Sequence, residues 1–225
     1  LVLLALLPFS RHLYEAIASP MLAQMPEGSS MIAIDVASPF LTPFKMTMLI
    51  AIMISIPMVL YQLWAFVAPA LFKHEKRLAR PLLFSSVFLF YAGCAFAYFL
   101  VFPLVFGFMN RVAPDGVAVM TDISKYLDFV MTLFLAFGIA FEVPIATIIM
   151  VATGITTPEK LAGWRPYIIV GAFAIGMILT PPDVISQTLL ALPMWLLFEV
   201  GIIMSRILIK TEEKEEEPDG DQATS

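Results

Sequence analysis

The stretch FKMTMLIAIMISIPMVLYQLWAFV, residues 44–67, decides the fold class, because its 24 residues carry one charged side chain, Lys45. About 20 consecutive apolar residues in a helix are enough to cross the ~30 Å hydrocarbon core of a bilayer. An apolar run of this length is too long for a strand and has no polar face for a surface helix. This stretch therefore predicts a transmembrane helix.

The composition extends this prediction to the whole chain. Of its 225 residues, 60% are hydrophobic and 14% are charged, whereas soluble domains are about half apolar and about a quarter charged. Further apolar segments occupy residues 1–18, 81–108, 127–151, 167–180 and 184–203. The sequence predicts an all-α membrane protein of six transmembrane helices, the first truncated at its N-terminus, in a single domain over residues 1–206.

The fifth segment, residues 167–180, is unusually short. Its 14 residues would cover only ~21 Å as a helix, at ~1.5 Å per residue. Such a helix lies deep inside a bundle or is surrounded by a thinned bilayer. Prolines 57, 103, 144 and 193 fall inside four of the segments, which predicts kinked helices and a concave shape.

Basic residues orient the chain. Nine of the 13 Lys and Arg residues fall in 68–80, 152–166 and 206–225, and four fall on the other side of the predicted membrane. By the positive-inside rule, the first group is cytoplasmic, and the loops 19–43 and 109–126 face outward. With six spans, both termini are cytoplasmic.

The C-terminal tail, residues 207–225, differs in composition from the rest of the chain. Seven of the 18 acidic residues lie between Glu212 and Asp221. A segment with so few apolar side chains cannot bury enough surface to offset the entropy of ordering it. We expect an acidic, disordered cytoplasmic tail.

Glu142 is the most informative single residue, because it lies well inside the apolar segment 127–151. A carboxylate at membrane depth costs at least ~2.5 kcal/mol on insertion scales, so it faces a cavity or a partner. Alternatively, it is a hydrogen-bonded or protonated side chain that staples two helices. Pro144, two residues on, predicts a local break in the helix.

Two other acidic residues have both ordinary and functional interpretations. Glu75 is the one acid of the basic loop 68–80; it balances its neighbours, or it binds a cationic partner, for which the planar fork of arginine is best suited. Asp183 follows Pro181 and Pro182; it caps the sixth helix or takes part in function.

The residues give little support for an enzyme. The predicted topology places His12 and His74 on opposite sides of the membrane, and the single cysteine, Cys94, lies in an apolar run as a small buried hydrophobe. Neither Gly-x-Ser-x-Gly nor His-Glu-x-x-His occurs, and there is no Gly-rich phosphate loop. We expect no catalysis and no cofactor. A binding receptor and a secondary transporter or proton channel using Glu142 and Asp183 both remain open.

Several long motifs resemble one family. They are MIAIDVASPF (residues 31–40), YQLWAFVAPAL (61–71), KHEKR (73–77), FEVP (141–144), RPY (165–167), LTPPDV (179–184) and SQ (186–187). In this order they resemble TatC, the signal-receptor subunit of the twin-arginine protein translocase, in its proteobacterial form. The resemblance covers about residues 10–206.

The resemblance implies a fold and an activity. A TatC-like protein is a glove-shaped bundle of six helices in the bacterial inner membrane, with short fifth and sixth helices. It binds the twin-arginine signal peptides of folded cargo, and associates with TatB, TatA and further copies of itself. Export is driven by the proton-motive force without ATP, and neither a cofactor nor a nucleic acid is involved.

The resemblance also implies roles in signal binding. Glu75 would hold the paired arginines, with Phe66, Leu71 and Arg77 nearby, and Glu142 would face the concave interior. The family carries a second glutamate in a Glu-Leu-Arg motif of an N-terminal segment, which precedes the first residue of this chain.

Roles at the other side of the membrane follow from the same resemblance. Pro20 and Asp183 match positions that the family needs for activity on the outer side. Met177, Thr180 and Gln187, on the fifth and sixth helices, would dock the single-span partners TatB and TatA.

Overall fold

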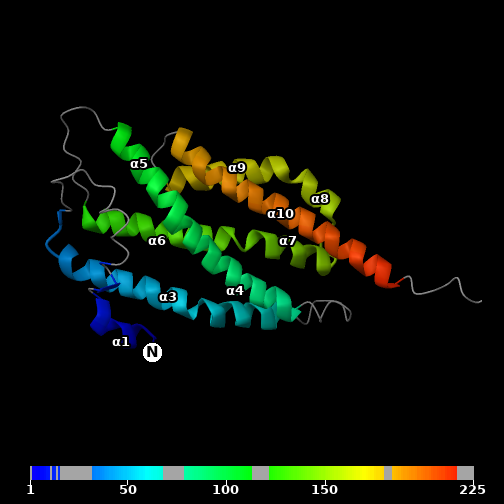
Figure 1. The fold of residues 1–225 in the computed structure, drawn as a ribbon, viewed down its shortest axis with the longest axis horizontal. Helices are drawn as coiled ribbons and strands as arrows, with labels where there is room; N and C mark the ends of the chain where they lie inside the picture. The colour runs from blue at the N-terminus through cyan, green and yellow to red at the C-terminus, as the bar shows by residue number, and fades with distance from the viewer. Residues whose placement is uncertain are drawn as a thin grey trace, which may run out of the picture.

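The computed structural model describes residues 2–10, 12–13, 15, 32–67, 79–112, 122–179 and 184–216. Nearly all of these residues are helical, and this part of the chain contains no strand, only an isolated bridge between Ile32 and Asp122. The helices lie side by side along one axis and alternate in direction (Figure 1). The predicted all-α fold is confirmed.

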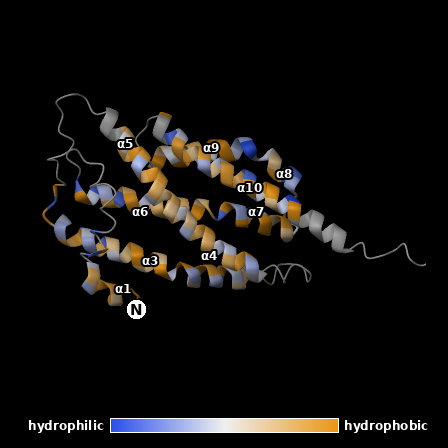
Figure 2. Cartoon of the chain, in the orientation of Figure 1, coloured by the Kyte–Doolittle hydropathy of each residue, from blue (hydrophilic) through white to orange (hydrophobic). Residues whose placement is uncertain are grey.

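The elements follow the predicted spans in chain order. They are α1 (Val2–Leu6), η1 (Leu7–Phe9), α3 (Ser38–Val67), α4 (Ala79–Phe96), the π-helix η4 (Ala97–Val101), α5 (Phe102–Val112), α6 (Ile123–Ala140), α7 (Val143–Ala152), α8 (Pro158–Gly163), α9 (Arg165–Leu179) and α10 (Val184–Glu216). Hydrophobic residues cover most of their length (Figure 2).

Four stretches of the described chain are long and apolar enough to cross a membrane. They are Ser38–Phe66, Pro81–Phe108, Ile123–Ala152 and Gln187–Ile207. The apolar helix Arg165–Ile178 is shorter, as the sequence predicts for the fifth segment. Of the first segment, the structure describes α1, η1 and a few residues beyond them.

The C-terminal helix is longer than the sequence predicts. We expected the sixth helix to end near residue 203 and the chain to be disordered from residue 207, whereas α10 has 33 residues and ends at Glu216. Extending an existing helix requires no new nucleus, and the Ile, Leu, Lys and Glu residues of this stretch favour helix. The acidic residues 217–225 lie outside the described part of the chain.

Two of the four intramembrane prolines interrupt their helices. Proline lacks an N–H and clashes with the carbonyl four residues earlier. For Pro144 that carbonyl belongs to Ala140, where α6 ends. For Pro103 it belongs to Phe99, which lies within the π-helix η4. A π-helical turn is wider than an α-helical turn and leaves room for the proline ring. The sequence predicts a break at Pro144 and a kink at Pro103, but not the π-helix.

The other two prolines, Pro57 and Pro193, lie inside the continuous helices α3 and α10. Pro57 leaves the carbonyl of Met53 without its usual partner, and the Tyr91 hydroxyl of α4 donates to that carbonyl at 2.8 Å. A backbone group freed within a membrane must find such a substitute donor. The carbonyl that Pro57 leaves without a donor in α3 is thus hydrogen-bonded by a side chain of α4.

The main core lies between α3, α4, η4, α5 and α6. Its largest fully buried side chains include Tyr126, Phe102 and Phe137. At Gly93 of α4, a Cβ would lie 2.5 Å from the Phe137 carbonyl oxygen of α6, so only glycine permits this approach of the two backbones. This core fixes the position of the break between α6 and α7.

A second group of helices packs beside this core. α10 contacts α7 on one side and α9 on the other. At Gly201 of α10, a Cβ would lie 2.1 Å from Thr147 Oγ1 and 2.9 Å from Pro144 Cα. The closeness of α7 and α10 therefore depends on this glycine, and α9 lies at the edge of the bundle.

Candidate functional site

Glu142 lies in the two-residue turn between α6 and α7. Its N–H donates to the Ile139 carbonyl at 3.0 Å, and its own carbonyl accepts from Ala146 at 2.9 Å. The turn follows from Pro144, which starts α7 and ends α6 at Ala140. Glu142 is therefore placed at a break within an apolar stretch, as the sequence predicts.

The carboxyl group of Glu142 is held from the neighbouring helix. Ser86 of α4, which is 1% exposed, donates its hydroxyl to Glu142 Oε2. The second oxygen, Oε1, is buried and has no hydrogen-bond partner in the structure. This contact corresponds to the helix-stapling alternative of the sequence analysis. A buried oxygen without a donor is also able to accept a hydrogen bond from a bound group.

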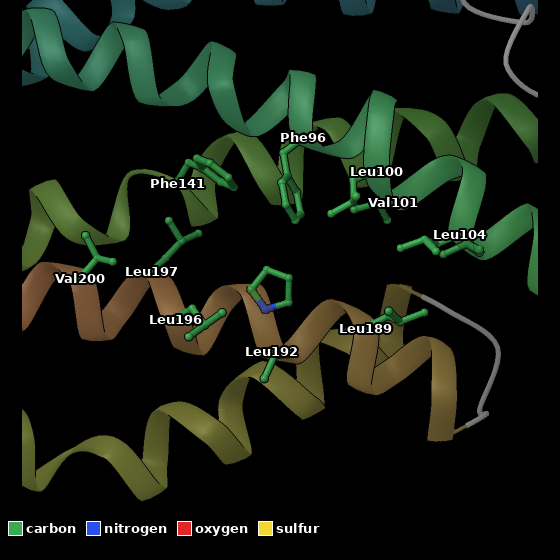
Figure 3. A pocket seen from close by; sticks show the side chains of 12 residues that line it. Phe96, Leu100, Val101, Leu104, Phe141, Leu189, Leu192, Leu196, Leu197 and Val200 are labelled. Atoms are coloured by element: carbon green, nitrogen blue, oxygen red, sulfur yellow. The ribbon is translucent and has the colours of Figure 1, made fainter.

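An apolar cavity of about 400 Å³ lies beside the break. Phe96, Leu100 and Leu104 form one wall, from α4, η4 and α5; Leu192 and Leu196 of α10 face them (Figure 3). Phe141, directly before Glu142, reaches into the same space, whereas Glu142 itself is not a lining residue. The cavity offers contact to apolar groups only.

The residues expected to bind a signal peptide are only partly described. Phe66, at the C-terminal end of α3, is 85% exposed. Leu71, Glu75 and Arg77 lie outside the described residues. Their predicted contact with Phe66 remains a prediction.

Only some of the residues expected at the outer side and in partner docking lie within the described part of the chain. Gln187 of α10 donates through Nε2 to the Phe173 carbonyl of α9 at 2.8 Å, and Met177 of α9 is 58% exposed. Pro20, Thr180 and Asp183 lie outside the described residues. The structure brings Gln187 to α9, and docking itself remains a prediction.

The structure adds a charged contact between α9 and α10 that the sequence analysis missed. Arg165, the first residue of α9, donates through Nε to Glu199 Oε1 and through Nη2 to Glu199 Oε2, the latter at 2.9 Å. Glu199 lies in the sixth apolar segment, so the criterion that singled out Glu142 also applies to it. Its partner, 34 residues away, could not be read from spacing.

Catalytic or metal-binding groups do not gather in the described chain. No three His, Cys, Asp or Glu side chains there lie close enough to hold a metal ion. Cys94 is free and buried, as its apolar surroundings predict. The fold and these contacts define a class: a polytopic α-helical membrane protein whose intramembrane carboxyl groups are each bonded to a neighbouring helix.

Comparison with known proteins identifies the family within that class. The family described as "Sec-independent protein translocase protein (TatC)" matches residues 1–193. The chain belongs to the TatC family. It is therefore a protein-translocase component and not an enzyme, as the sequence predicts.

Relatives and solved structures agree with this assignment. The chain is 56% identical over 216 residues to the TatC protein of Escherichia coli K12, covering 96% of this chain and 84% of the relative. It is 60% identical over 206 residues to that of Haemophilus influenzae, covering 92% and 80%. A crystal structure described as "Twin Arginine Translocase Receptor- TatC" superposes with a TM-score of 0.80 at 38% identity, covering 90% of this chain and 89% of that one. The predicted fold is thereby confirmed.

Proposed function

We propose that this protein is the signal-peptide receptor of a twin-arginine translocase in a bacterial inner membrane. In this proposal it binds twin-arginine signal peptides of folded proteins and assembles with TatA, TatB and further copies of itself. Export then uses the proton-motive force. The observation that carries the proposal is the similarity to the twin-arginine translocase receptor along 90% of the chain.

The arrangement of the helix ends supports one orientation. The end of α3, the start of α4, the end of α7 and the end of α10 lie at one end of the bundle (Figure 1). These ends flank the segments that hold nine of the 13 basic residues. Because cytoplasmic loops are enriched in Lys and Arg, we propose that this end faces the cytoplasm and that both termini of the native protein lie on that side.

Glu75 is the proposed anchor of the paired arginines. It follows α3 by eight residues in an otherwise basic loop. A charge-assisted hydrogen bond in a partly desolvated site contributes ~1.5–3 kcal/mol, against ~0–1 kcal/mol for an exposed ion pair. Arginine pairs with a carboxylate through two bonds and lysine does not. We therefore expect reversible binding that discriminates Arg-Arg from Lys-Lys.

Phe66 supports the same assignment. A phenyl ring that is 85% exposed at the inner end of a transmembrane helix offers apolar contact next to the proposed arginine site. Leu71 and Arg77 complete the predicted site. Arg77 balances the charge of Glu75 when no signal peptide is bound.

The partner subunits are proposed to dock at the outer end of α9 and α10. Met177 and Gln187 lie there, and Thr180 and Asp183 belong to the segment between the two helices. Single-span partners are held in a membrane by packing and by hydrogen bonds to polar side chains. Pro20 acts on the same outer side.

A transporter or proton channel through Glu142 is less well supported. The nearest cavity is lined by apolar side chains throughout, and a proton path needs polar groups or water. Glu142 instead bonds to Ser86. We propose that Glu142 acts within the receptor, at the break that shapes its concave interior.

The proposal is tested by peptide binding. The full-length protein in nanodiscs is titrated with a labelled Arg-Arg signal peptide and with its Lys-Lys counterpart. We expect binding of the Arg-Arg peptide alone, its loss in Glu75→Ala, and its retention in the control Glu159→Ala, which alters an exposed residue of α8. Equal binding of the two peptides would contradict the proposal.

A further inference from the structure

We propose that Arg165 and Glu199 are positioning residues for partner docking: their ion pair fixes the inner end of α9 on α10, and thereby sets the docking face at the outer end. The inference rests on the proposed function, since it assumes that partner subunits dock on these two helices. The inference gives a role to the contact between Arg165 and Glu199, which takes no part in the proposed binding of the signal peptide.

The geometry of the pair is directional. Arg165 donates two bonds to the two oxygens of one carboxylate. A two-bond contact between a guanidinium and a carboxylate restricts both distance and rotation, whereas a single charge contact restricts distance only. The pair therefore fixes how the first turn of α9 is rotated against α10.

The position of Glu199 makes the pair costly to open. Glu199 lies 15 residues after the start of α10, about 22 Å along the helix axis and within the ~30 Å of hydrocarbon. Its neighbours Phe198 and Val200 are apolar. The side chain of Glu199 is 19% exposed and that of Arg165 is 42% exposed, so an opened pair would leave the Glu199 carboxylate without its two hydrogen-bond donors, with Arg206 as the remaining charge that acts on it.

The rest of the contact between α9 and α10 is apolar. Ala172 and Ala191 meet in its buried centre, with Phe173 and Leu197 packed beside them, and Ile168 packs against Phe198 and Ile202. Apolar packing lets two membrane helices approach closely, whereas the paired bonds of Arg165 and Glu199 also have a set direction. The opposite side of α9 is exposed at Tyr167 and Val170, where no other described helix holds it.

Two polar contacts hold α9 on α10. Gln187, near the start of α10, donates to the carbonyl of Phe173 in the middle of α9, and at the first residue of α9 Arg165 binds Glu199. Without the ion pair, α9 can rotate about the contact of Gln187 with Phe173. Met177, about three turns beyond Arg165 and exposed, would then no longer lie at a fixed position relative to Gln187.

The test compares single neutral variants with a charge exchange. In the full-length protein, Glu199→Gln and Arg165→Gln are expected to reduce the amount of TatB that copurifies from membranes by about tenfold, which corresponds to 1.4 kcal/mol of docking free energy. The double variant Arg165→Glu/Glu199→Arg restores an ion pair and is expected to recover most of the lost docking. Glu159→Gln, on the exposed surface of α8, is the matched control and docks like the wild type.

Signal-peptide binding by the same samples separates positioning from loss of fold. We expect Arg-Arg peptide binding by every variant to remain close to that of the wild type. Normal docking by Glu199→Gln, or no recovery in the exchanged pair, would overturn the inference. Loss of docking and peptide binding together would overturn it too, since the pair would then be needed for folding. A wild-type protein that retains no partner would refute the proposed docking itself.

Discussion

The core around α4 and α6 and the hairpin of α9 and α10 are held together in different ways. In the core, large aromatic side chains interdigitate, and Gly93 lets the backbone of α4 approach that of α6. In the hairpin, Ala172 and Ala191 meet in the middle, and two polar contacts join the helices, one at the first residue of α9 and one at Phe173. The difference indicates a rigid part that maintains the fold and a part whose position depends on a few polar groups.

The core predicts the largest effect of a single substitution. Gly93→Val places a Cβ 2.5 Å from the Phe137 carbonyl oxygen, and a backbone atom cannot move aside. Overpacking of this kind costs ~3 kcal/mol or more. Gly107→Val is the matched control, because a Cβ there meets no atom within 4 Å.

The measurement is the thermal unfolding midpoint of the purified protein in detergent. We expect Gly93→Val to lower it strongly and Gly107→Val to leave it nearly unchanged. Equal midpoints for the two variants would mean that the core tolerates a shift of α4, and the contrast with the hairpin would not hold.

The contact at the helix break predicts an intermediate effect. Ser86→Ala removes the hydroxyl that donates to Glu142 Oε2 and leaves neither carboxyl oxygen with a donor, at a cost of ~1–3 kcal/mol. Ser85→Ala, at the next position, is the control. A double-mutant cycle with Glu142→Ala, followed by thermal unfolding, measures the coupling. Additive effects of the two substitutions would show that the contact contributes nothing.

The same site predicts a separation of activities. Glu142→Gln is expected to leave Arg-Arg peptide binding largely intact and to impair export, because Glu142 is remote in sequence from the proposed arginine site at Glu75. Peptide titration and an export assay on the same variant measure the two. Lost peptide binding with normal export would refute this assignment.

The outer contact of the hairpin predicts a smaller effect. Gln187→Leu removes the hydrogen bond to the Phe173 carbonyl, and such bonds between membrane helices contribute ~0.6–1.7 kcal/mol. Thr188→Ala is the control, since the Thr188 hydroxyl bonds to Val184 of its own helix. Thermal unfolding should separate the two variants by a few degrees. A larger effect of Thr188→Ala would contradict the role given to Gln187.

The smallest effect on stability is expected from an ion pair on the exposed surface of the core. Lys45 of α3 and Asp128 of α6 form an exposed ion pair at 3.0 Å, and exposed pairs contribute ~0–1 kcal/mol. Lys45→Met should therefore change the unfolding midpoint little, and the change should shrink as salt screens the charges. A change that is large or independent of salt would show that the pair is more shielded than its exposure indicates.

The sequence predicts the parts of this molecule that depend on composition and on proline. The spans, the short α9 and the break at Pro144 follow from apolar length and from a missing N–H. It also singles out Glu142, because an acid in an apolar run is conspicuous.

What the sequence does not predict depends on which helices are neighbours. Ser86 and Glu142 are 56 residues apart, and Arg165 and Glu199 are 34 residues apart. Neither separation matches the spacing of neighbours within one helix, so the two contacts become known only from the way the helices pack.

The receptor assignment is tested most directly by export in a bacterium that lacks its own TatC. The full-length protein is expressed there, and the export of a folded reporter with an Arg-Arg signal is compared with that of the same reporter with Lys-Lys. The account predicts export of the Arg-Arg reporter, dependent on the proton-motive force, and none of the Lys-Lys reporter. Equal export of both reporters, or export of neither by a protein that is present in the membrane, would contradict it.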